Sequence, residues 1–393
     1  MIKFEMNTKT NTWPASLHDV PQIFAWKNMT GFHSTLTGTY FAFLREKYLQ
    51  RIDRFVQAGV GGELQDLVAS LPPSALERII LAPRSCNDLL YAPPTDLVYH
   101  LESARAEQCR SGDARPKDEL WTAMGDQCFV PEQPNQAWSI YDVLDRRYPL
   151  EESDISAPLI EGGIPVDFSS PHAKDRIKDD TQEFTPLSAG EQATAVEKLN
   201  QAMRIIAKAC PAAFNLILAY TRVIVVGNNP DSPKLFSSSS TEMYTGRVVI
   251  INAHTEATSI DDLVDTLVHE AIHNILYIIE IEDPIIPKEL QETADPTRIP
   301  SPWTGNSLFL HPFCHACFVW LGMWSFWEYI GSNGLHPFSE SVISYRVDRS
   351  SSGFRKAEML TALGKAGPHL SPSAKETMWN FTMNARRGKL PIH

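Results

Sequence analysis

The sequence predicts an α+β fold that is predominantly helical, with a small sheet beside one long helix. Apolar residues recur at helical spacing over much of the chain, for example within residues 35–60, 188–210 and 259–277. Residues 222–226 and 247–251 are instead rich in β-branched side chains and are bounded by turn residues, as is typical of strands. With 393 residues, 43% hydrophobic and 21% charged, the chain has the composition of a globular protein with a large core.

The pattern along the chain divides it into three parts. Residues 1–150 are expected to form a helical N-terminal region, with helices at 35–60 and 96–109. Between residues 151 and 187 the periodicity fades among prolines, glycines and a charged run, which indicates a connecting segment. Residues 188–393 are expected to form the domain that carries the chemistry.

Three helices, two strands and a further helical tail are expected in this last part. A helix covers residues 188–210, and the two strands follow it. The next helix begins at Ser259, which together with Asp262 has the pattern of an N-terminal cap. A proline-rich loop then leads to an aromatic helix over residues 312–330.

The bulk properties exclude some classes of partner. The formal net charge of −12 argues against nucleic acid, because phosphate binding needs a basic surface. The first residues lack the apolar stretch of a secretion signal, and the longest apolar run, residues 313–330, is interrupted by polar residues. We therefore expect a cytoplasmic protein with no membrane partner, whose six cysteines are reduced thiols.

The stretch His269-Glu270-Ala271-Ile272-His273 lies inside the helix that begins at Ser259. His269 and His273 are four residues apart, so both imidazoles lie on one helix face and can hold one divalent cation. Glu270 lies on an adjacent face, from which it can reach a metal-bound water or orient a ligand. Two histidines and a carboxylate among apolar neighbours would be costly to bury without such a partner.

The identity of a third metal ligand decides which reaction the site could catalyse, and the sequence offers two candidates. Glu292 follows the motif by eighteen residues, a distance that resembles gluzincin aminopeptidases, and would complete a zinc site in which Glu270 activates water. His315 opens the aromatic helix and can face inward onto the metal, and His311, one turn earlier, could substitute for it.

Several blocks occur in the order seen in a known family. They are residues 236–240 (Phe-Ser-Ser-Ser-Ser), 246–250 (Gly-Arg-Val-Val-Ile), 267–273 (Leu-Val-His-Glu-Ala-Ile-His), 301–303 (Ser-Pro-Trp) and 315–316 (His-Ala). Over roughly residues 185–370 the chain resembles the HExxH-motif peptide-modification proteins, described as iron(II)/2-oxoglutarate-dependent peptide β-hydroxylases. The resemblance implies that His269, His273 and His315 bind iron and leave positions open for 2-oxoglutarate and dioxygen.

The chain departs from this family at its arginine positions. Thr304 and Leu308 stand where the family carries arginines after Ser-Pro-Trp. A 2-oxoglutarate carboxylate normally requires a bidentate guanidinium. Arg346, Arg349 or Arg355 could supply this guanidinium. Alternatively, the enzyme could use another reductant, or its substrate could chelate the iron directly.

The resulting functional expectation is a mononuclear non-haem iron oxygenase. It would use dioxygen, with 2-oxoglutarate as a possible cosubstrate, to hydroxylate or otherwise oxidise an amino-acid- or peptide-derived substrate in specialised biosynthesis. The N-terminal region could bind a leader peptide or carrier, cover the site, or mediate a homodimer. The alternative is a zinc-dependent hydrolase of gluzincin type, with Glu270 as base and Glu292 as third ligand; a third possibility is a metal that only staples the fold.

Overall fold

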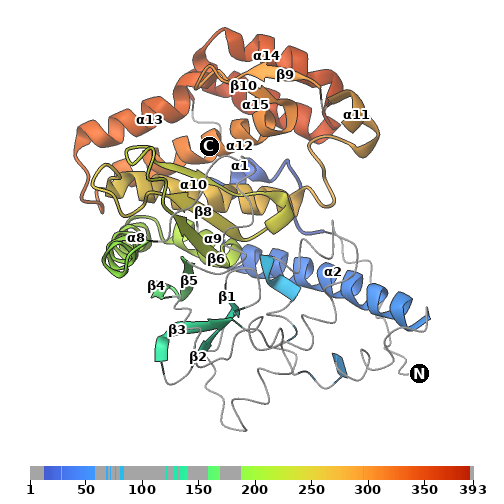
Figure 1. Cartoon of the computed structure of the whole chain (residues 1–393). Coiled ribbons are helices and arrows are strands. Elements are labelled where there is room, and N and C mark those ends of the chain that lie inside the picture. The colour runs from blue at the N-terminus through green and yellow to red at the C-terminus, as the bar shows by residue number, and fades with distance from the viewer. Residues whose placement is uncertain are drawn as a thin grey trace.

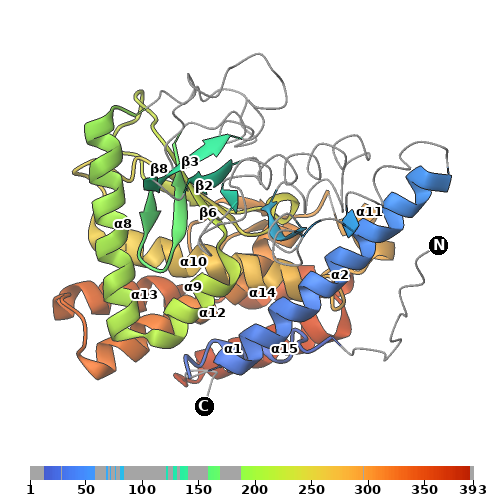
Figure 2. The ribbon, with the colours of Figure 1, turned by 90° about the horizontal axis from the view of Figure 1, so that it is seen from below.

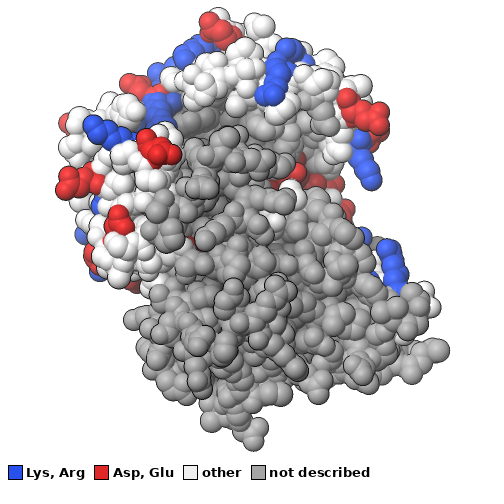
Figure 3. All heavy atoms as spheres, viewed as in Figure 1, with Lys and Arg blue, Asp and Glu red and all other residues white. Residues whose placement is uncertain are grey.

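The computed structural model describes residues 13–27, 29–57, 158–168, 187–294 and 296–389, a few positions between 68 and 83, and the backbone of strands within 121–139. Helices predominate around a five-stranded mixed sheet and a small hairpin, so the expected α+β class is confirmed (Figure 1). Among the described helices, none is long and apolar enough to cross a membrane. Basic and acidic side chains are interspersed on the described part of the face in Figure 3.

The N-terminal part is only partly helical. α1 (Val20–Ile23) and α2 (Thr30–Gln57) are helices, and α2 lies against α9 (Pro211–Tyr220) (Figure 2). Three antiparallel strands follow, β1 (Trp121–Thr122), β2 (Gln127–Val130) and β3 (Gln133–Ser139). The helical pattern expected for most of this region does not extend to these strands, whose conformation depends on cross-strand pairing rather than on local periodicity. The helix expected at 96–109 lies outside the described residues.

The central sheet has the order β4-β5-β6-β8-β7. β4 (Leu159–Ile160) and β5 (Ile164–Asp167) come from the predicted connecting segment, and β5 pairs in parallel with β6 (Val223–Gly227). β6 pairs in parallel with β8 (Arg247–Ile251), as the β-branched runs predicted, and β7 (Ser237–Ser239) adds an antiparallel edge. Ile224, Val226, Val248 and Ile250 face the main core, whereas the alternate residues form a smaller apolar cluster on the other face.

Two helices pack beside this sheet with the boundaries expected from the sequence. α8 (Ala189–Ala209) begins at a capping box formed by Ser188 and Glu191. α10 (Ile260–Ile279) begins at a second capping box, formed by Ser259 and Asp262. α10 contacts α8 and α9 on one side and α12 on the other, so it lies at the centre of the molecule (Figure 1).

The C-terminal layer is built on the aromatic helix. α12 (Leu310–Asn333) is buried over most of its length and ends at Gly334, whose φ of 66° is the left-handed conformation that terminates many helices. A hairpin of β9 (Arg298–Pro300) and β10 (Ser307–Phe309) precedes it. α13 (Glu340–Arg355), α14 (Glu358–Ala366) and α15 (Pro372–Arg386) follow, while α11 (Gln291–Ala294) lies in the proline-rich loop.

Candidate metal centre

The candidate site lies where α10 faces the first turns of α12. Along α10, His269 and His273 are followed by Glu280, the C-cap residue, eleven positions after His269. Eleven residues are close to three helical turns, so all three side chains lie on one side of the helix. The His269 and His273 ring centroids are 5.0 Å apart.

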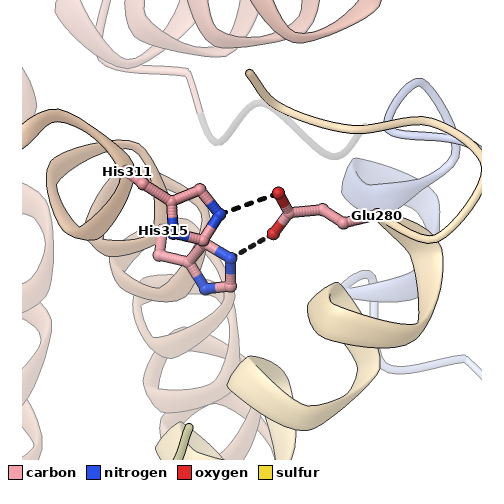
Figure 4. A group of neighbouring side chains, drawn as sticks. All are labelled: Glu280, His311 and His315. Atoms are coloured by element: carbon pink, nitrogen blue, oxygen red, sulfur yellow. Dashed lines mark hydrogen bonds and ion pairs between the residues drawn. The ribbon is translucent and has the colours of Figure 1, made fainter. Parts of the chain in front are cut away.

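Glu280 meets two histidines of α12. Its Oε2 lies 2.8 Å from Nε2 of His311, and its Oε1 is hydrogen bonded to Nε2 of His315 (Figure 4). The two rings are one turn apart on α12, with centroids separated by 4.5 Å. One donor atom from each of the three residues lies within 4.8 Å of the others, so Glu280, His311 and His315 could hold a metal ion.

The backbone also fixes the Glu280 carboxylate. Ile285 N–H, in the loop after α10, donates to Oε2 at 3.3 Å. The side chain of His315 is 2% exposed and that of Glu280 12%, whereas that of His311 is 32% exposed. A buried carboxylate held between two imidazoles is arranged before any ligand arrives, which lowers the reorganisation that binding requires.

Burial and neighbouring charges set the protonation states. Burial alone would raise the pKa of Glu280, but the positive charges of His315 and His311 outweigh it and lower that pKa. Burial lowers the pKa of His315, whereas the Glu280 carboxylate outweighs burial at His311 and raises its pKa. Glu280 is therefore ionised, the state that a cation requires of a carboxylate ligand. A cation bound at Nε2 of His311 and of His315 would displace the protons through which these atoms are hydrogen bonded to Glu280.

His273 contacts the other ring nitrogen of His315, Nδ1, whereas Nε2 of His315 faces Glu280. The Nδ1 atoms of His273 and His315 are 3.0 Å apart, and the rings are nearly parallel at 8°. Burial lowers the pKa of His273 well below its usual value, and the charges of the neighbouring histidines act in the same direction. Tyr277 stacks on His315 with a centroid separation of 4.8 Å and donates its hydroxyl to the Ser240 carbonyl at 3.2 Å.

Glu270 is tied to the edge strand of the sheet. Ser238 donates its hydroxyl to Oε1 and Ser240 donates to Oε2, each at 2.7 Å. The residue is 2% exposed. Both carboxylate oxygens are thus engaged by β7 and the residue that follows it, so Glu270 fastens α10 to the sheet.

The structure brings some of the residues predicted from the sequence together and leaves others apart. His273 and His315 are in contact, and His269 lies beside His273 but outside the group whose donors converge. Glu292, on α11, is exposed and is likewise outside that group. That His269, His273 and His315 together bind the metal stays a prediction.

Two of the arginines considered for a cosubstrate, Arg346 and Arg349, have different surroundings. Arg346 is 3% exposed and is engaged by carboxylates of α10, with Nη2 2.6 Å from both Asp261 and Asp262. Burial alone would lower the pKa of Arg346, but the surrounding carboxylates raise it. Arg349 is exposed, with its guanidinium 5.4 Å from the centroid of the Trp320 ring. Binding of a carboxylate cosubstrate by either arginine stays a prediction.

An aromatic wall adjoins the site. Trp320 of α12 meets the His269 ring edge-on at 5.9 Å and stacks with Trp303, of the Ser-Pro-Trp block, at 6.0 Å. Trp303 donates its indole N–H to the Ser350 carbonyl at 2.8 Å. Gly353 faces the same indole so closely that a Cβ there would lie 2.3 Å from it. These contacts hold apolar surface beside the histidines and exclude water from that side.

Sequence reasoning did not identify Glu280, and it considered His311 only as a substitute for His315. The signal for Glu280 was its spacing from His269, which continues the face of the helix carrying both motif histidines. Comparison with protein-family models and with curated proteins finds no match to this chain.

Proposed function

We propose that this protein is a mononuclear non-haem iron(II) oxygenase whose metal centre lies at the crossing of α10 and α12. The observation that carries the proposal is the buried group of Glu280, His311 and His315, whose donor atoms converge. Two histidines and one carboxylate, with positions left open, are the donor set of many iron(II) oxygenases. Bound iron would supply the activation of dioxygen.

The same donor set also occurs in zinc hydrolases, so other residues must distinguish the two classes. A hydrolase of gluzincin type needs a glutamate that is free to take a proton from water. Both oxygens of Glu270 accept hydrogen bonds from serine hydroxyls, and Glu292 is exposed on α11. These contacts favour the oxygenase and give Glu270 a supporting role.

The proposed substrate is amino-acid- or peptide-derived, oxidised at carbon in specialised biosynthesis. The support for this class is the resemblance to the HExxH-motif peptide-modification proteins at residues 236–240, 246–250, 267–273, 301–303 and 315–316. The possible cosubstrate is 2-oxoglutarate, and exposed Arg349 is a better candidate than Arg346, because the Arg346 guanidinium is engaged by Asp261 and Asp262.

Anaerobic titration of the purified protein with iron(II) tests the metal centre. Because losing a group that only supports a ligand costs about 10–100-fold in affinity, loss of a ligand should cost more than about 100-fold. We expect a loss of this size from each of His315→Ala, His311→Ala and Glu280→Gln. Glu292→Gln is the control and should bind iron as the unchanged protein does.

Two outcomes would contradict the proposal. One is tight zinc binding with peptide hydrolysis that is lost in Glu292→Gln, which would establish the hydrolase. The other is loss of iron in His269→Ala with full affinity in Glu280→Gln and His311→Ala, which would move the metal to the ligand set expected from the family resemblance. Oxygen consumption by the iron-loaded protein, with and without 2-oxoglutarate, then tests the reaction class.

A further inference from the structure

We propose that His273, the second histidine of the HExxH stretch, is a positioning residue that orients His315 for the metal rather than a metal ligand. The inference rests on the proposed iron centre and assigns this part of the motif a supporting role there. It follows from the placement of the two nitrogens of His315. Nε2 contacts Glu280, the carboxylate of the convergent group, whereas Nδ1 faces Nδ1 of His273 at 3.0 Å.

The positions of the protons on the two imidazole rings are consistent with a supporting role for His273. If Nε2 of His315 gives its lone pair to a cation, the single proton of the neutral ring resides on Nδ1. That N–H then donates to Nδ1 of His273, whose own proton is on Nε2. Each ring carries one proton, and both the contact between the rings and the metal bond are satisfied.

Histidine ligands commonly donate their second nitrogen to a carbonyl or carboxylate, which fixes the tautomer and the tilt of the ring. Here the acceptor is the imidazole of His273, and a neighbouring tyrosine packs against both histidine rings. Tyr277 stacks on both rings, at 4.8 Å from His315 and 6.1 Å from His273. The tyrosine is itself held by its hydrogen bond to the Ser240 carbonyl. His315 therefore has one orientation available, with Nε2 toward Glu280 and His311.

The competing role for His273 is direct coordination together with His269. His269 lies outside the group whose donors converge, and its ring meets Trp320 edge-on at 5.9 Å. The second nitrogen of His315, in contrast, has His273 as its hydrogen-bonding partner. The contacts thus favour support of His315 over a metal position between the motif histidines.

The test compares two substitutions at His273. The side-chain oxygen of asparagine can occupy roughly the place of the imidazole Nδ1, so His273→Asn keeps an acceptor for His315 and His273→Leu does not. In anaerobic iron(II) titrations we expect His273→Leu to weaken binding about 10–100-fold and His273→Asn to recover affinity to within about threefold. The electronic spectrum of the iron(II) protein should shift in His273→Leu and return in His273→Asn.

Controls separate this inference from the proposed function and from misfolding. His369→Leu removes a histidine that lies on η4 (Gly367–His369), outside the crossing, and should bind iron as the unchanged protein does. Urea unfolding of each variant reports whether the fold survives. Loss of iron from both His273 variants, to the extent seen in His315→Ala, would overturn the inference by making His273 a ligand. Unchanged affinity and spectrum in both would overturn it by removing any role. If the unchanged protein binds no iron, the proposed function itself fails.

Discussion

Arg346 of α13 is joined to Asp261, in the first turn of α10, by two hydrogen bonds. Its Nε and Nη2 lie 3.1 and 2.6 Å from the same carboxylate oxygen. Asp262, which also caps α10, accepts a further hydrogen bond, and Asp265 lies 3.7 Å away. One buried guanidinium thus fastens the C-terminal layer to the start of α10.

Removing this guanidinium should destabilise the protein strongly. Arg346→Leu would leave three carboxylates without their cation, and breaking a buried ion pair from one side costs about 3–5 kcal/mol. The free energy of unfolding in urea measures the effect. Arg349→Leu is the matched control on the same helix, where loss of an exposed contact with Trp320 should cost at most about 1 kcal/mol. Equal losses in the two variants would contradict the structural role of Arg346.

The hydrogen bonds from Ser238 and Ser240 to Glu270 predict that replacing alternate serines in and after β7 changes stability by different amounts. Ser238→Ala and Ser240→Ala each leave one buried carboxylate oxygen without its donor, so each should lower the free energy of unfolding by about 1–3 kcal/mol. Ser239 lies between them, and its side chain points to the opposite face of the strand. Ser239→Ala should therefore change stability by less than about 0.5 kcal/mol. A similar loss in all three variants would show that the hydroxyl contacts with Glu270 contribute nothing specific.

The close approach of Gly353 to Trp303 makes a side chain at this position costly. A Cβ there would lie 2.3 Å from the indole ring, so Gly353→Ala must displace Trp303 and should destabilise the protein by about 1–3 kcal/mol. Gly364 lies in α14 with nothing within 4 Å of a Cβ, so Gly364→Ala should stabilise by up to about 1 kcal/mol. Thermal unfolding distinguishes these opposite signs, and a stable Gly353→Ala variant would show that the aromatic wall can shift.

His33 should make stability depend on pH below neutrality. Burial lowers its pKa from 6.5 to about 4. The unfolded chain therefore binds a proton that the folded protein excludes. The stabilisation is present above pH 6.5 and is lost as the pH falls toward 4, by at most about 3 kcal/mol.

Two variants separate burial from hydrogen bonding as the cause of this dependence. His33→Leu should flatten the profile of unfolding free energy against pH between 6.5 and 4. Tyr220→Phe removes the hydroxyl that lies 3.1 Å from Nδ1 of His33 but leaves the ring buried, so the profile should persist. Persistence of the profile in His33→Leu would assign it to other groups.

Local sequence signals predicted the elements that carry the site. The capping box at Ser259 and Asp262 marked the start of α10, and the β-branched runs marked β6 and β8, because these signals depend on neighbouring residues. The strands β4 and β5 were interpreted as part of a linker, since they are short and lie among prolines and glycines. Their strand conformation comes from the pairing of β4 with β5 and of β5 with β6, which no local pattern reveals.

The candidate site was predicted in part for the same reason. The spacing of His269 and His273 along one helix is local, and His315 was expected to meet that helix. Which nitrogen of His315 faces which partner depends on how α12 crosses α10, forty-two residues further along the chain. The spacing of Glu280 from His269 is also local, but its role depends on the contacts with His311 and His315 that this crossing makes.

The pairing of β5 with β6 bears on whether residues 188–393 could be separated from the rest of the chain. Val166 and Asp167 are aligned with Ile224 and Val225 along the β6 border. A shortened chain starting at residue 188 would leave that edge of β6 unpaired. Its exposed peptide groups could then pair with strands of other chains and cause aggregation. Any attempt to transplant this half into another scaffold must carry residues 158–168 with it or supply a substitute strand.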